Sequence, residues 1–402
     1  MSTLMRNLKT TIVFGDIKKV KKLLKSLAPI PLSKNPLIFG GYSLLKLAIK
    51  LRNRKEIVKL LIKKGARVNK KYCDKSSPLL HIAIRQQHLD IVKLLVKKGA
   101  NVNEPDHHNM TPMFVTIESL QMLSRESPTI DIMKFLIRKG ADIQAKDEEG
   151  CTALALSCGL HQFRMTRLLL KLNCNVNSTT IFDSNSISIA VLTNSWKVAS
   201  LLLKYNAWAN STISDMTISY CSGYYRDLPA RRLNSLGENP TLTKSFKRTP
   251  LMLAIEEISS EIVHLLLKKG ARIDDLDEDG TSPLYYLICN PNNVNSRLNV
   301  EMIERYRQSK KYILIYLINA GVNVNETSES GGTKLKFLTM ALTYGEEHIV
   351  KYLVECFDLD FMLVDHEILE KVKLNTTLLS EEQLEDQQFM NKLKKSIHEN
   401  GV

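Results

Sequence analysis

The sequence predicts an all-α solenoid of stacked helix–turn–helix units with short β-hairpin fingers between them. Two observations carry this prediction. The chain has 402 residues, too many for one ordinary core, and its 44% hydrophobic content excludes a mostly disordered chain. A segment of about 33 residues also recurs along the chain, and such a period is typical of repeat arrays. The length therefore reflects the number of repeats.

The second, outer helix of each unit is its most regular element. Four of them, beginning at Glu56, Asp90, Asp131 and Glu261, start with an acid, place apolar residues three and four apart, and end in Lys or Arg followed by Gly-Ala. This spacing predicts an amphipathic helix, stopped by a left-handed residue at the glycine. The final cations offset the negative end of the helix dipole. The expected stop residues are Gly65, Gly99, Gly140, Asn173, Asn206, Gly270, Gly321 and, weakly, Phe357.

A shorter, inner helix precedes most outer helices. Proline at its first position loses no hydrogen bond, and the Ser or Thr before it can cap the helix. Examples start at Ser77-Pro78, Thr111-Pro112, Thr249-Pro250 and Ser282-Pro283, and Thr152 starts a similar helix without proline.

The pattern Thr-Pro-Leu-His-x-Ala, a second helix and Gly-Ala-x-Val-Asn resembles the ankyrin repeat. The resemblance covers roughly residues 40–360 and about eight repeats, and it implies binding through fingers and inner helices. His81 matches the family's structural histidine. The expected parts are an N-terminal capping half-repeat over 1–39, repeats one to five over 40–210, a loop insertion over 211–247, repeats six to eight over 248–360 and a C-terminal helical tail over 361–402.

Three segments interrupt the period. Glu118–Pro128 is expected to lengthen a turn between two helices, and the later part of Asn290–Gln308 to extend an outer helix from Val300. The 211–247 insertion combines tyrosines with arginines, as protein interfaces often do. A tolerated surface insertion explains the same segment without a function.

No catalytic motif is present, so the sequence predicts no enzyme and no cofactor. The pair His107-His108 lacks the further ligands of a metal site and is expected at an exposed finger tip. Seven scattered cysteines without CxxC pairs fit free thiols in a reducing compartment, the cytoplasm or the nucleus. No transmembrane segment is expected.

The formal net charge of +14 is uneven, because residues 1–100 hold 24 Lys and Arg but four acids. We expect a non-catalytic scaffold for protein–protein interaction, with an acidic partner surface at the basic N-terminal half. A solvated basic face, an adaptor recruiting substrates to a complex such as a ubiquitin ligase, and nucleic-acid or anionic-membrane binding remain alternatives. The expected partner-binding residues are Arg67, Lys70, Lys71, Tyr72, Lys75, His107, His108, Tyr224, Tyr225, Arg231 and Arg232.

Overall fold

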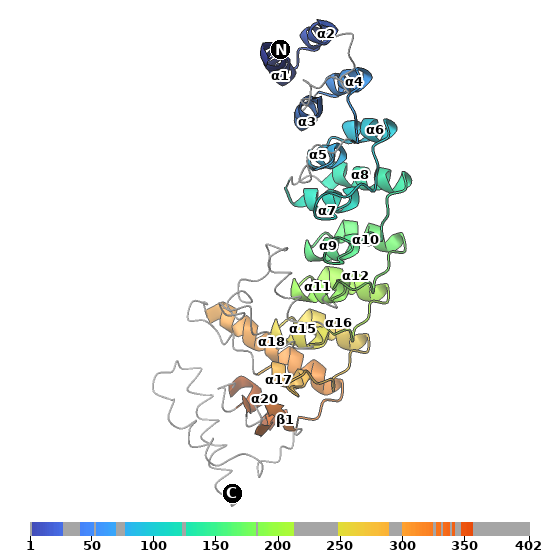
Figure 1. The fold of residues 1–402 in the computed structure, drawn as a ribbon. Helices are drawn as coiled ribbons and strands as arrows, with labels where there is room; N and C mark the ends of the chain where they lie inside the picture. Colours follow the sequence, from blue (N-terminus) through green and yellow to red (C-terminus); the bar gives the residue numbers. More distant parts are fainter. Residues whose placement is uncertain are drawn as a thin grey trace, which may run out of the picture. The chain divides into compact units, whose positions relative to one another are not determined.

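The computed structural model of the chain is built almost entirely from helices (Figure 1). It divides into two compact blocks, Met1–Asn175 and Val176–Val402, called here the N-terminal and C-terminal blocks. The described residues are 2–26, 41–51, 54–69, 77–122, 126–181, 184–212, 248–288, 300–324, 327–330, 333–337, 340–341 and 347–356.

The N-terminal block stacks helix pairs in two layers (Figure 1). Each inner helix packs on the next inner helix, as α3 does between α1 and α5, and each pairs with the outer helix that follows it. The inner helices are α1 (Ser2–Phe14), α3 (Gly41–Lys50), α5 (Leu79–Arg85), α7 (Pro112–Met122) and α9 (Ala153–Gly159), and the outer helices are α2 (Ile17–Ser26), α4 (Lys55–Lys63), α6 (Leu89–Lys97), α8 (Glu126–Arg138) and α10 (Phe163–Lys171).

The C-terminal block continues the same pairing. Its helix α15 packs on α11 and α16 on α12, although the segment 213–247 separates the pairs in the chain. The pairs are α11 (Ser186–Leu192) with α12 (Trp196–Lys204) and α15 (Pro250–Glu256) with α16 (Ser260–Lys268). Then α17 (Pro283–Tyr286) packs on α15 and α18 (Val300–Asn319) packs on α16. Strands β1 (Thr327–Ser330) and β2 (Thr333–Lys336), which pair antiparallel, and α20 (Glu347–Cys356) follow.

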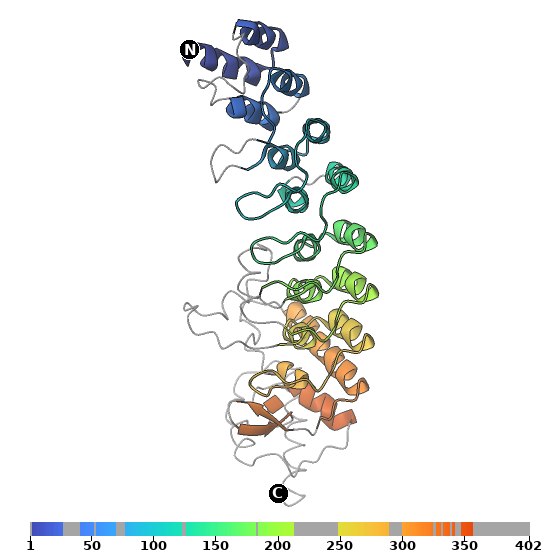
Figure 2. The same cartoon turned by 45° about the vertical axis from the view of Figure 1, so that its right-hand side comes forward.

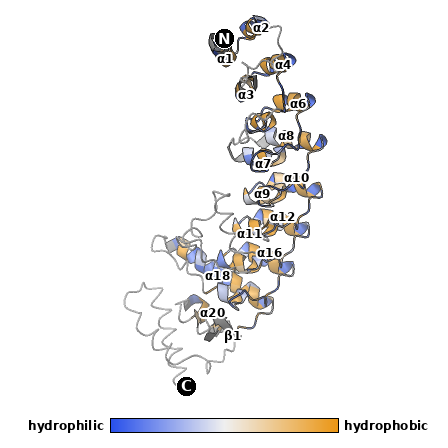
Figure 3. Cartoon of the chain, in the orientation of Figure 1, coloured by the Kyte–Doolittle hydropathy of each residue, from blue (hydrophilic) through white to orange (hydrophobic). Residues whose placement is uncertain are grey.

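The core lies between the layers. Inner helices such as α9 are buried on every side, and their small residues allow close packing of neighbours. Outer helices bury one face only, as α6 does with Ile91, Val92 and Leu95. In Figure 3 the outer helices α12 and α16 are hydrophobic over most of their length and hydrophilic at one end.

The predicted helix stops are confirmed wherever the structure describes them. Gly65, Gly99, Gly140, Gly270 and Gly321 have φ between 79° and 99°. At two helix stops asparagine replaces glycine in the left-handed conformation, with φ of 57° at residue 173 and 61° at residue 206. The eighth expected stop, residue 357, lies outside the described residues.

The caps of the inner helices also follow the sequence in two cases. Thr249 Oγ1 accepts a hydrogen bond from the Met252 amide at 3.3 Å, ahead of Pro250 at the first helical position. Thr152 caps α9 in the same way, accepting from Ala155 N at 3.3 Å. The hydroxyl of Ser77 makes a different bond, described below.

Asparagines tie several of the repeats to the next. Asn103 Nδ2 donates to Gly140 O at 3.0 Å, and its Oδ1 accepts from Asp142 N at 2.8 Å. Asn177 and Asn210 make the equivalent pair of bonds in the C-terminal block. Because Asn210 reaches residues 270 and 272, the repeats on either side of 213–247 are direct neighbours.

The N-terminal half-repeat is corrected to a complete helix pair, α1 and α2, packed on α3 and α4. Leu4, Leu8 and Ile12 of α1 do lie at helical spacing, but the helix was missed because its β-branched run from Thr10 to Val13 disfavours helix. The Thr10 and Thr11 hydroxyls bond the carbonyls of Arg6, Asn7 and Leu8 within the same helix.

The expected long turn over Glu118–Pro128 is also corrected. Helix α7 continues to Met122 and α8 begins at Glu126, so the extra residues mainly lengthen the helices. Pro128 is tolerated in the first turn of α8 because the amides of a first helical turn have no hydrogen-bond acceptor within the helix. The predicted extension from Val300 is confirmed, since α18 begins at that residue.

Candidate functional site

The fingers of the N-terminal block project from its inner layer (Figure 2). The second finger spans residues 101–111 and the third spans 142–152. Their ladder pairing is sparse, with a single isolated bridge, Lys146 to Thr152, in the described part of these two fingers. Aspartate side chains close the loops instead. We call the first finger, which begins at Arg67, together with these two fingers and helices α5 and α7, the finger face.

Asp106 closes the second finger and Asp147 the third. Each donates its amide to the carbonyl four residues on, at 3.0 and 3.1 Å. Asp106 Oδ1 accepts from the amides of His108 and Met110, both at 3.1 Å. Asp147 Oδ1 accepts from residues 149 and 151 in the same pattern. These turns hold the fingers in one conformation.

The second carboxylate oxygen distinguishes the two aspartates. Asp106 Oδ2 lies 3.7 Å from Arg85 Nη2. Asp147 Oδ2 is buried and has no hydrogen-bond partner among the described residues. Burial therefore raises the pKa of Asp147 to about 6, and the neighbouring Glu149 and Glu148 add to the rise.

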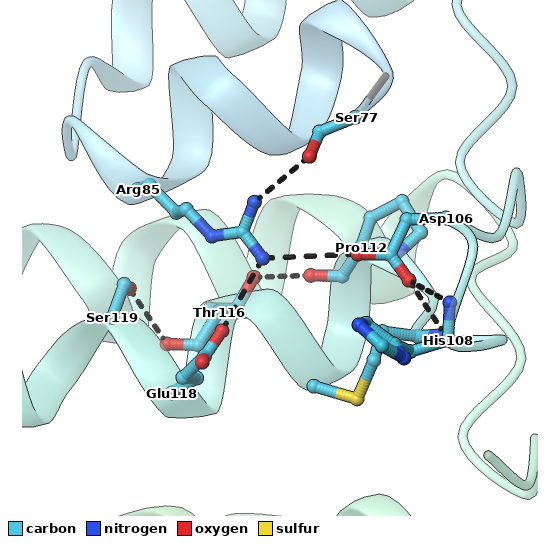
Figure 4. Close-up of polar contacts among 9 residues, drawn as sticks. Ser77, Arg85, Asp106, His108, Pro112, Thr116, Glu118 and Ser119 are labelled. Atoms are coloured by element: carbon cyan, nitrogen blue, oxygen red, sulfur yellow. Dashed lines mark hydrogen bonds and ion pairs between the residues drawn. The ribbon is translucent and has the colours of Figure 1, made fainter. Parts of the chain in front are cut away.

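Arg85, at the end of α5, joins two repeats (Figure 4). Its Nη1 donates to Ser77 Oγ at 3.3 Å, and its Nη2 lies 3.5 Å from Glu118 Oε2 and 3.7 Å from Asp106 Oδ2. The Arg85 side chain is 32% exposed and Glu118 35% exposed, so the cluster remains open to a partner. Sequence reasoning missed Arg85. The sequence feature that could have indicated it is its position as the single cation at the end of the apolar run LLHIAIR.

The predicted pair His107-His108 lies at the exposed tip of the second finger. The two rings are 4.0 Å apart between centroids. His108 Nδ1 lies 3.9 Å from Glu148 Oε2 on the third finger, and Asn109 Nδ2 donates to Lys146 O at 3.2 Å. The structure therefore brings this pair against the neighbouring finger.

The charge of the finger face changes along it. Arg67, at the base of the first finger, is exposed, and its role in partner binding stays a prediction. The third finger instead carries Asp142, Asp147, Glu148 and Glu149 against a single cation. The positive charge expected at the N-terminal half therefore does not include the third finger.

Eight of the predicted partner-binding residues remain predictions. They lie outside the described residues and are Lys70, Lys71, Tyr72, Lys75, Tyr224, Tyr225, Arg231 and Arg232.

The described residues include no group of three or more His, Cys, Asp or Glu arranged to hold a metal ion. Cys151, Cys158 and Cys174 are buried free thiols, and burial raises the pKa of Cys174 to about 11, which keeps it protonated. In the described part of the chain, no helix is both long and apolar enough to cross a bilayer.

The comparisons with known proteins agree with this geometry. A family model described as ankyrin repeats (3 copies) matches residues 9–115, 120–213 and 224–300. Curated proteins gave no match. A similar solved structure is the ankyrin repeat domain of Bcl-3, described as a unique member of the IkappaB protein family, with 19% identity and a TM-score of 0.47 over 70% of this chain and 100% of that chain.

Proposed function

The chain belongs to the ankyrin repeat family, and we propose that it is a non-catalytic scaffold that binds a protein partner through its finger face. Stacked repeats of this kind present extended surfaces to other proteins. A scaffold for protein–protein interaction follows from the family, whereas the surface and the partner's chemistry are our proposals.

The observation that carries the choice of surface is the Arg85 cluster. A partly exposed arginine between Asp106 and Glu118 is fixed in position before any partner arrives. Arginine is enriched among residues that dominate interface energies. The fingers beside it are closed by Asp106 and Asp147, so binding orders few side chains and loses little affinity to entropy.

An acidic partner surface fits the N-terminal end of this face. Arg67 is exposed there, and the same finger carries Lys70, Lys71 and Lys75 in the sequence. The second finger carries Glu104 and Asp106 without Lys or Arg, and the third finger adds further acids, so an acidic partner is repelled there and its contact centres on the first finger. Because the positive charge is confined to one part of the surface, this arrangement favours one docking position, which a uniformly basic surface would not.

The test uses the full chain and a partner identified by proximity labelling. Titration should show affinity reduced at least about tenfold by Lys70→Glu, Lys71→Glu and Lys75→Glu together, and also by Arg85→Ala. Lys268→Glu with Lys269→Glu, at the end of α16, is the matched control and should bind like the parent. Equal affinity for all variants would exclude the finger face as the binding surface.

A further inference from the structure

The first helix pair exposes apolar residues at its turn. Phe14 is 82% exposed, Val13 45% and Ile17 37%. The turn joins the end of an inner helix to the start of an outer helix, whereas the fingers lie at the opposite end of the inner helices. This surface is therefore separate from the finger face.

The turn is held in place by Arg54 from the next repeat. Arg54 Nε donates to Ile12 O at 3.0 Å, and Nη2 donates to Val13 O at 2.6 Å. Gly15 has φ of 81°, and a Cβ there would lie 2.6 Å from Arg54 Cζ, so only glycine fits. The exposure of Phe14 is thus a property of an ordered turn.

A basic face follows directly on α2. Its five lysines, Lys18, Lys19, Lys21, Lys22 and Lys25, are all exposed. The opposite face buries Val20 and Leu24 against the stack. Residues 17, 21 and 25 are four apart, so Ile17 begins a row that continues in lysines.

The charge of α2 is less compensated than that of the next outer helix. On α4, Lys59 pairs with Glu56 at 2.6 Å and Lys55 with Asp90 at 3.0 Å. Among the described residues, only Lys19 of the α2 lysines has an acid partner, Asp16 at 3.5 Å. Uncompensated positive charge therefore concentrates beside the exposed apolar turn.

We propose that the Val13–Ile17 turn and the lysine face of α2 together bind an anionic phospholipid membrane. The three apolar side chains enter the boundary between headgroups and acyl chains, while the lysines meet the negative surface. Charge alone would fit a nucleic-acid backbone equally well, but binding to phosphates would not use the ordered, exposed apolar side chain of Phe14.

The experiment is co-sedimentation of the full chain with vesicles of phosphatidylcholine, with and without phosphatidylserine. Binding should require phosphatidylserine. Lys18→Gln with Lys22→Gln should weaken it by about fivefold for each lysine. Phe14→Ser should weaken it by about tenfold, without unfolding the turn, because Arg54 holds the turn through the carbonyls of Ile12 and Val13 and not through the Phe14 side chain.

Matched controls come from the C-terminal block. Leu276→Ser removes another exposed apolar residue, and Lys268→Gln with Lys269→Gln removes two outer-helix lysines. Both should bind vesicles like the parent, and circular dichroism should be the same for all variants. Failure to bind phosphatidylserine vesicles, or equal binding without that lipid, would overturn the proposal. So would an unaffected Phe14→Ser variant whose binding is displaced by duplex DNA, which would indicate a phosphate-binding surface.

Discussion

At the scale of single residues, left-handed backbone positions separate the helices of each pair. Besides the helix stops, the second residue after α5, α9, α11 and α15 has positive φ, from 52° to 55° at Gln87, His161, Asn194 and Ile258. Asparagine tolerates this conformation well, but a β-branched residue is strained in it. Ile258 is therefore the least favourable of these positions.

We predict that Ile258→Asn raises the free energy of unfolding by about 1 kcal/mol, through relief of this strain. Thermal or urea unfolding of the full chain measures it. Ile258→Val keeps the β-branch and should give no gain. A loss of stability in Ile258→Asn would mean that the apolar contacts of the half-buried side chain outweigh its backbone strain.

Asp147 gives the fold a dependence on pH. Its pKa is about 6 in the fold against a model value of 3.8, so between these values the folded chain binds more protons than the unfolded chain. The contribution to stability is therefore present below about pH 4 and is lost as pH rises to about 6.

Asp147→Asn should remove this dependence and raise the unfolding temperature at pH 8 relative to the parent. The amide oxygen still accepts the bonds from residues 149 and 151 that close the finger. Unfolding temperatures at pH 5 and pH 8 provide the measurement. Asp147→Ala loses those bonds and should be destabilised at both; an unchanged pH profile in Asp147→Asn would assign the dependence to other groups.

At the scale of elements, the helix pair is the unit of stability, and its neighbours hold it through both packing and asparagine bonds. The contacts of α15 with α11 and of α16 with α12 show that residues 213–247 do not interrupt the stack. The bonds of Asn210 cross the same junction. We therefore expect stability here to depend on the junction.

Replacing residues 213–247 by a short Gly-Ser linker should leave helical circular dichroism and cooperative unfolding intact. Asn210→Ala should instead destabilise the chain by about 1–2 kcal/mol, because it removes two hydrogen bonds between repeats. A linker variant that unfolds at much lower temperature than Asn210→Ala would show that the insertion supports the stack.

Sequence reasoning succeeded where one residue decides the local structure. Gly99 adopts the left-handed conformation because it has no side chain, and Thr249 caps a helix with its own hydroxyl. Both features were predicted. It failed for α1 and for the lengthened α7 and α8, where packing against neighbours overrides weak propensity. It placed His107 and His108 at a finger tip but missed Arg85, because Arg85's partners in the next repeat are set by the fold.

At the scale of the whole molecule, the charge distribution separates two roles. The second and third fingers carry more acids than Lys and Arg, whereas the outer helix α2 is basic with little compensation. A protein partner on the finger face and a membrane at the Val13–Ile17 turn would use different surfaces of the same block. The net charge of +14 is therefore a sum of local patches with different uses.

The central claim, that the finger face of the N-terminal block binds a protein partner, is tested most directly by hydrogen exchange of the full chain with and without that partner. We predict slowed exchange over residues 101–111 and in α5 and α7, around Arg85. Slowed exchange confined to the outer helices or to the C-terminal block, with the finger face unchanged, would contradict the claim.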